Sequence, residues 1–188
     1  MENSAPAPVD PAADSAAEEA LEEWDVLLAD GTPTGRTTLR GRREFGEGEY
    51  HLVVGMCVLA EDGSVLVTRR APGKTHEGRW EFPAGSALAG ETSVEAAQRE
   101  LAEETGLRFE ASEFEFFERI TERTALFDVY VVRVAEPLEV TPQPGEVDAY
   151  RWVHPREIFE QPRRVDFAGP WLRRFETIEE RLRGVLWG

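Results

Sequence analysis

The chain has 188 residues, enough for one domain with a sizeable core, and its formal net charge is −16. Seven acidic residues but no Lys or Arg fall in residues 1–23, so the rest of the chain carries −16 + 7 = −9. This acidic balance argues against binding to nucleic acid or to an anionic membrane. The single cysteine, Cys57, excludes an intrachain disulfide.

The sequence shows no run of about 18 apolar residues that could span a membrane. Its first residues lack the basic start and apolar middle of a signal peptide. Together with the lone cysteine, these features predict a cytoplasmic protein.

Residues 1–23 are rich in Ala, Pro, Asp and Glu. Such a segment buries too little apolar surface to offset the entropy cost of ordering it. We therefore expect a disordered acidic tail over 1–23, with partner binding as its alternative role, and one folded domain over 24–188.

Short apolar or alternating segments separated by turn residues predict most of the strands of this domain. The expected strands are two around Asp30-Gly31 within 24–41, one buried on both faces at 51–60, its hairpin partner at 64–70, a short one within 79–85, and three at 113–122, 124–136 and 146–153. Helices are expected at 92–105 and 169–183, with helical turns from Pro155. Because strands and helices do not alternate regularly, the order predicts an α/β fold with a mixed sheet and helices on both sides.

The helix at 92–105 has clear start and stop signals. Thr92 and Glu95 form a capping-box pattern, and Gly106 suits the position just after a helix end. Between them, Glu100, Glu103 and Glu104 are spaced three and four apart, so they share one side of the helix.

Three neighbouring carboxylates repel one another, by roughly 0.2–0.5 kcal/mol for each pair. They are either a solvated acidic face or a set of oxygen ligands for a hard cation such as Mg²⁺. Taken alone, the cluster leaves the two interpretations about even.

A longer pattern around the cluster favours the metal site. The chain reads G-x5-E-x7-R-E-U-x-E-E-x-G-U, where U is an apolar residue. The fixed positions are Gly85, Glu91, Arg99, Glu100, Glu103, Glu104 and Gly106, and the apolar positions are Leu101 and Leu107. This pattern resembles the Nudix box.

The resemblance implies a Nudix-like α/β/α sandwich that hydrolyses a nucleoside diphosphate linked to another group X, with Mg²⁺ or Mn²⁺. It implies that Glu100, Glu103 and Glu104 bind the metal and that Gly85 offers its carbonyl to it. The implied partner is a small phosphorylated molecule. A homodimer is left open.

The resemblance assigns the remaining residues of the box to supporting roles. Arg99 would orient a glutamate through a salt bridge, and Glu91 would brace the loop before the helix. Gly106 ends the helix.

The general base is left open between Glu100 and a glutamate outside the box, for which Glu146 is the candidate. Arg69 and Arg70 end the strand at 64–70. The resemblance implies that residues at such positions can meet the phosphates of the substrate, a contact that suits arginine. Salt bridges at the rim of the site are the alternative for both arginines.

Residues 34–55 and 85–91 resemble a branch of the superfamily that includes isopentenyl-diphosphate isomerase. Those enzymes use a cysteine near the start of the box and bind metal through histidines. Here Cys57 lies far earlier, and His51 is followed by Gly55 where a second histidine would be expected. The intact box therefore favours a hydrolase of this branch, with an isomerase-like enzyme or a non-catalytic nucleotide-binding domain as alternatives.

Overall fold

A mixed β-sheet forms the centre of the molecule in the computed structural model, which describes residues 22–42, 44–160 and 166–187. In this part of the chain the sheet has seven strands, in the order β5-β4-β3-β8-β7, with β6 also paired to β3 and β9 to β4. Its strands are β3 (His51–Ala60), β4 (Val65–Arg70), β5 (Trp80–Glu81), β6 (Ala84–Ser86), β7 (Phe114–Thr121), β8 (Ala125–Val134) and β9 (Val147–Val153).

Strand β3 lies at the centre because both of its faces are apolar. Val54, Met56 and Val58 belong to one core cluster, whereas Cys57 and Leu59 belong to the other. Strand β3 runs parallel to β8, from the pair His51–Ala125 to the pair Ala60–Val134, while the other pairings of the sheet are antiparallel. The expected strand buried on both faces is confirmed.

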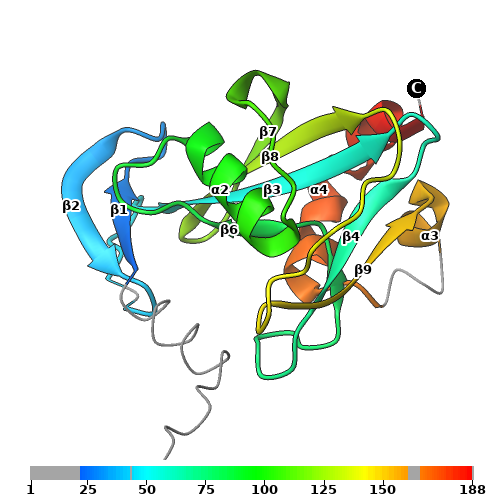
Figure 1. The fold of residues 1–188 in the computed structure, drawn as a ribbon. Helices are drawn as coiled ribbons and strands as arrows, with labels where there is room; N and C mark the ends of the chain where they lie inside the picture. Colours follow the sequence, from blue (N-terminus) through cyan, green and yellow to red (C-terminus); the bar gives the residue numbers. More distant parts are fainter. Residues whose placement is uncertain (1–21, 43, 161–165, 188) are drawn as a thin grey trace, which may run out of the picture.

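Helices cover both faces of this sheet (Figure 1). Helix α2 (Ser93–Thr105) packs on the first core cluster through Ala97 and Leu101. Helix α4 (Gly169–Trp187) packs on the second through Trp171 and Phe175. The short α3 (Pro155–Phe159) adds buried residues to the same cluster, and the 3-10 turn η1 (Ala111–Glu113) comes directly before β7. The α/β/α arrangement expected from the sequence is confirmed.

A separate two-stranded hairpin precedes the sheet. It consists of β1 (Glu23–Leu27) and β2 (Pro33–Leu39), and its backbone reaches Tyr50, which exchanges two hydrogen bonds with Leu27. The carboxylate of Asp25 accepts from the N–H of Gly90 at 2.7 Å, which ties the hairpin to the loop before α2.

The expected tail over 1–23 lies outside the described residues except for its last two. Glu23 begins β1, and the carboxylate of Glu22 pairs with Arg40 at 2.8 Å. Glu22 and Glu23 thus belong to the described structure, where an ion pair and a strand end hold them, and the tail expected over the preceding residues stays a prediction.

Two boundaries differ in detail from the sequence prediction. The short strand expected within 79–85 is two strands, β5 and β6, separated at Pro83, whose carbonyl accepts from the N–H of Met56. The last helix continues to Trp187 rather than ending near 183. Among the described residues, no helix combines the length and apolar character needed to cross a membrane.

Candidate active site

Helix α2 is held at both ends by the residues that the sequence indicated. Thr92 N–H donates to the Glu95 carboxylate at 2.8 Å, and Thr92 Oγ1 accepts from the Glu95 N–H, which completes the capping box. Gly106 ends the helix with a φ of 74°, a left-handed conformation that glycine adopts without strain. The rigid helix between these ends fixes the three glutamates relative to the sheet.

Arg99 is the centre of a hydrogen-bonded network at the start of the site. It donates to both oxygens of Glu91, from Nε at 2.7 Å and from Nη2 at 2.8 Å, while Glu91 also accepts from the N–H of Leu88. Its Nη1 reaches Glu100 at 2.9 Å and Glu103 at 3.1 Å. Burial opposes the charge of Arg99, but the hydrogen bonds to Glu91 and Glu100 outweigh it and raise its pKa. Arg99 and Glu91 are therefore placed to orient the glutamates and to brace the loop.

Glu104 is buried and Glu100 is half-buried. Burial raises the pKa of Glu100 to about 7, even though Arg99 favours its charged form. Burial, with Glu81 and Glu100 nearby, raises the pKa of Glu104 well above its usual range. Glu104 accepts a hydrogen bond from the N–H of Ala84 at 3.3 Å. Two neighbouring carboxylates withdrawn from water need a compensating positive charge to stay ionised.

Gly85 lies directly beneath Glu100. A Cβ atom at this position would be 1.9 Å from the Glu100 carboxyl carbon, so only glycine leaves room for that side chain. Gly85 is in β6, opposite Val54 of β3, so its backbone is fixed by the sheet.

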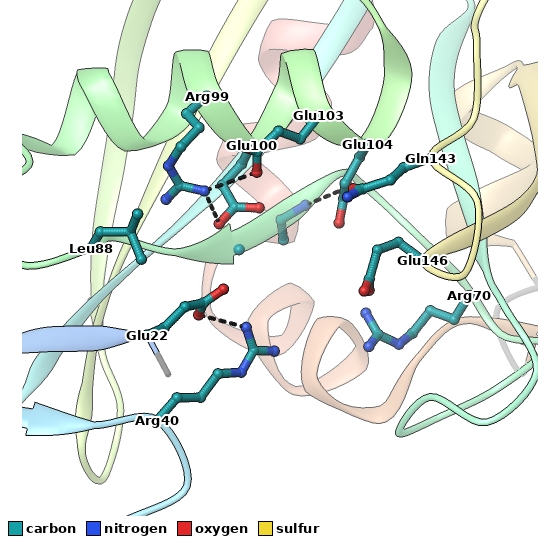
Figure 2. Close-up of a pocket in the computed structure, with 12 residues that line it drawn as sticks. Glu22, Arg40, Arg70, Leu88, Arg99, Glu100, Glu103, Glu104, Gln143 and Glu146 are labelled. Carbon is teal, nitrogen blue, oxygen red and sulfur yellow. Dashed lines mark hydrogen bonds and ion pairs between the residues drawn. The ribbon is translucent and has the colours of Figure 1, made fainter. Parts of the chain in front are cut away.

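The glutamates face a pocket of about 210 Å³ (Figure 2). Its lining residues are Glu22, Arg40, Arg70, Ala84, Gly85, Leu88, Arg99, Glu100, Glu103, Glu104, Gln143 and Glu146. Figure 2 shows the acidic side chains of α2 on one side of the pocket, with Arg40 and Arg70 on the other. Carboxylates and arginines thus meet across a space large enough for a small phosphorylated group.

The structure separates the two arginines that end β4. Side chains alternate between the two faces of a strand, and Arg70 lines the pocket whereas Arg69 does not. Instead, Arg69 makes two hydrogen bonds to Asp148, at 2.7 and 3.0 Å, and lies near the ring of Trp80. The expectation of a phosphate contact now rests on Arg70, and Arg69 has the rim salt bridge that was its alternative.

Glu146, the candidate base outside the box, lines the pocket from the loop before β9. It forms an ion pair with Lys74, and the backbone carbonyl of Glu146 accepts from the N–H of Ala71. Glu146 is therefore held at the same end of the pocket as Arg70 (Figure 2).

Cys57 and His51 lie away from the pocket lining. Cys57 is fully buried in β3, and burial raises the pKa of its thiol to about 12. The ring of His51 stacks on Trp24 at 4.4 Å, and its Nδ1 lies 2.8 Å from the carbonyl oxygen of Thr124. Both residues contribute to packing in this arrangement.

A metal ion would have to compete for the glutamates. Within the described ranges, no three His, Cys, Asp or Glu side chains are grouped so that they could hold a metal ion as they stand. The three glutamates that the resemblance assigns to the metal are therefore not gathered as a ligand set, since Arg99 binds Glu100 and Glu103 while Glu104 accepts from the N–H of Ala84. The donors nevertheless fit a hard cation, since they are carboxylate and carbonyl oxygens around buried negative charge.

A family model described as "NUDIX domain" matches residues 49–175, which include the whole of this acidic helix and the pocket residues Arg70 and Glu146. The chain belongs to the Nudix family. The family assignment made from the box is confirmed.

Several Nudix relatives match over different parts of the chain. The uncharacterized Nudix hydrolase lmo0368 of Listeria monocytogenes is 43% identical over 96 residues, which are 49% of this chain and 55% of that protein. Nudix hydrolase 3 of Arabidopsis thaliana is 32% identical over 86% of this chain but only 24% of its own length. The chain thus spans about half the length of the first relative and about a quarter of the second.

A third relative belongs to the isomerase branch. The isopentenyl-diphosphate Delta-isomerase of Clavibacter sepedonicus is 31% identical over 80% of this chain and 84% of its own length. Among solved structures, DR0079 of Deinococcus radiodurans superposes with a TM-score of 0.67 at 20% identity, covering 81% of this chain and 98% of that one. At this identity the superposition shows that the two proteins share a fold.

The sequence prediction missed three polar residues of the pocket wall. Arg40, Glu22 and Gln143 come from the end of the hairpin and from the loop before β9, and all three lie outside the box. No sequence motif marks these three residues, because their position near α2 depends on how the hairpin and the loop pack. Their charged or amide side chains were the only hint.

Proposed function

We propose that this Nudix protein is a metal-dependent hydrolase that cleaves the diphosphate linkage of a nucleoside diphosphate-X type substrate. The observation that carries the proposal is a pair of carboxylates on α2, the buried Glu104 and the half-buried Glu100, which face Arg70 across one pocket. Buried like charges opposite an arginine suit a site that takes up cations and phosphate groups together.

The glutamates of α2 and the carbonyl of Gly85 are the groups that would hold Mg²⁺ or Mn²⁺. When bound, such an ion neutralises a diphosphate and lowers the pKa of a coordinated water. The bidentate contact of Arg99 with Glu91 keeps the loop before α2 in place, so that Gly85 stays beside Glu100. Glu103, whose side chain is 48% exposed, is the most accessible of the three.

On the other side of the pocket, Arg70 binds a phosphate group, because its guanidinium matches phosphate oxygens in charge and geometry. Proton transfer from the attacking water falls to Glu100 or to Glu146, which both line the pocket. Comparing the hydrolysis rates of Glu146→Gln and wild type decides between them. A rate close to wild type in Glu146→Gln assigns the base to Glu100.

We further propose a cytoplasmic protein whose partner is a small phosphorylated molecule rather than nucleic acid or a membrane. The net charge of −16 supports this, since acidic surfaces repel both polyanions.

The direct test is a phosphate-release screen with Mg²⁺ and with Mn²⁺. The panel comprises nucleoside diphosphate sugars, ADP-ribose, dinucleoside polyphosphates, nucleotide cofactors, nucleoside triphosphates and prenyl diphosphates. We expect metal-dependent hydrolysis of at least one member by wild type, with a loss of orders of magnitude in Glu103→Gln and Glu104→Gln. Hydrolysis that is unaffected by either substitution would contradict the assignment of the site.

The isomerase of Clavibacter sepedonicus makes isopentenyl-diphosphate isomerisation a second candidate. The position of Cys57 argues against it, because the one cysteine of the sequence is fully buried in β3 and does not line the pocket. We therefore expect no conversion of isopentenyl diphosphate to its isomer. Formation of dimethylallyl diphosphate by the wild-type protein would reverse this choice.

A further inference from the structure

Glu81 at the end of β5 and Arg70 at the end of β4 lie on the same face of the sheet. In the antiparallel β4–β5 pair, Glu81 is opposite Thr68, and Thr68 and Arg70 share a face because alternate residues do. The side chain of Glu81 is 11% exposed and is not among the groups that line the pocket, whereas Arg70 is. A buried carboxylate therefore stands directly behind a pocket arginine.

The guanidinium of Arg70 is anchored at two points. Its Nη1 donates to Glu81 Oε1 at 2.7 Å, and its Nε donates to the carbonyl of Thr75 at 2.5 Å. Because a guanidinium is planar and its N–H groups have fixed directions, two such bonds fix its orientation. Figure 2 shows its free end pointing toward Glu146 at the edge of the pocket.

Stability alone does not explain the pairing of Glu81 with Arg70. A buried ion pair is often no more stabilising than apolar residues of the same volume. Burial raises the pKa of Glu81, and the nearby Arg70 opposes that rise. The pair gives the Arg70 guanidinium a defined direction. A defined direction matters for a contact with phosphate, because arginine binds phosphate oxygens in a specific geometry.

We propose that Glu81 is a positioning residue that fixes the Arg70 guanidinium for contact with a phosphate group of the substrate. This inference rests on the proposed function, since it takes Arg70 as the phosphate contact. Glu81 touches no substrate and acts only through Arg70.

The test measures binding of methylenediphosphonate, a diphosphate analogue that resists hydrolysis, by calorimetry in saturating Mg²⁺. We expect Glu81→Gln to raise the Kd roughly tenfold, as is usual when the partner that orients a ligating group is removed. Glu122→Gln is the matched control, because Glu122 pairs with the buried Arg174 at 2.8 Å but does not line the pocket. That control should leave the Kd unchanged.

A double-mutant cycle separates positioning from a general effect on the fold. In an Arg70→Met background, Glu81→Gln should change the Kd by less than about twofold, because the group that Glu81 orients is gone. If Glu81→Gln fails to fold, Glu81→Asp keeps the charge, moves it back by one methylene, and should weaken binding to a similar extent. Thermal melting of each variant shows whether it is folded.

An unchanged Kd in a folded Glu81→Gln or Glu81→Asp variant would overturn the inference, as would an equal loss with and without Arg70. So would a wild-type protein that does not bind the diphosphonate. The hydrolysis screen tests the proposed function separately. If wild type hydrolyses a substrate but Glu81→Gln leaves the Kd unchanged, only this inference fails. If the Kd depends on Glu81 but wild type hydrolyses no substrate, only the enzymatic assignment fails.

Discussion

At the scale of single residues, Gly85 shows how little space the site leaves. An added Cβ would lie 1.9 Å from the carboxyl carbon of Glu100, so Gly85→Ala must displace that glutamate. We expect hydrolysis to fall about 100-fold or more, because a displacement of about 1 Å in a reacting group can cost that much. The measurement is the initial rate with the best substrate of the screen.

Gly184→Ala is the control for this substitution. Gly184 is in α4 and an added Cβ would meet no atom within 4 Å, so alanine should stabilise the helix by about 1 kcal/mol and leave the rate unchanged. A Gly85→Ala variant as active as wild type would show that Glu100 does not need its present position.

Cys57 leads to a prediction about reactivity. Its thiol is fully buried, and burial raises its pKa to about 12, so the reactive thiolate is almost absent near neutral pH. We expect no reaction with Ellman's reagent at pH 8 in the folded protein and one thiol per chain in guanidinium chloride. Cys57→Ala should keep most of the activity, and its complete loss with an intact fold would point to cysteine chemistry.

At the scale of elements, α2 depends on its capping box. Thr92→Ala removes the side chain that caps the helix, which typically costs about 1 kcal/mol. Urea unfolding should show this loss as a lower midpoint with an unchanged slope. Ser112→Ala, at an exposed position in η1, is the control and should shift the midpoint little. Equal midpoints for Thr92→Ala and wild type would mean that packing alone fixes the start of α2.

Local signals predicted this helix and most strands, because caps, turns and alternation act between residues close in the chain. These local signals do not predict which strands pair. Pocket residues whose position depends on strand pairing could therefore not be identified from the sequence. Arg69 and Arg70 are equivalent as sequence, and only the orientation of β4 in the sheet turns Arg70 alone toward α2. The sequence prediction did not include Glu81 for the same reason, because the β4–β5 register is what brings Glu81 close to Arg70.

At the scale of the whole molecule, the acidic cluster couples stability to divalent cations. Glu104 is buried beside Glu81 and Glu100, so neutralising it in Glu104→Gln should leave the metal-free protein as stable as wild type or slightly more stable. Mg²⁺ at about 100 times its Kd should stabilise wild type by about 2.7 kcal/mol, and Glu103→Gln and Glu104→Gln much less. Thermal unfolding of the three proteins, with Mg²⁺ and with chelator, measures this difference.

A solvated acidic face would give the opposite result, with no Mg²⁺-dependent shift in any of the three proteins. If neither Mg²⁺ nor Mn²⁺ shifts the melting temperature even with methylenediphosphonate present, the metal site is wrong and the hydrolase proposal falls with it.

The parallel pairing of β3 with β8 also bears on the order in which the molecule can assemble. Its first pair joins His51 to Ala125, which are 125 − 51 = 74 positions apart, and α2 with its glutamates lies in the segment between them. Closing so long a loop has an entropy cost that is repaid only after the strands meet, and such non-local contacts slow folding. During synthesis, the pocket therefore has to wait until β8 has left the ribosome, although its box residues precede that strand in the chain.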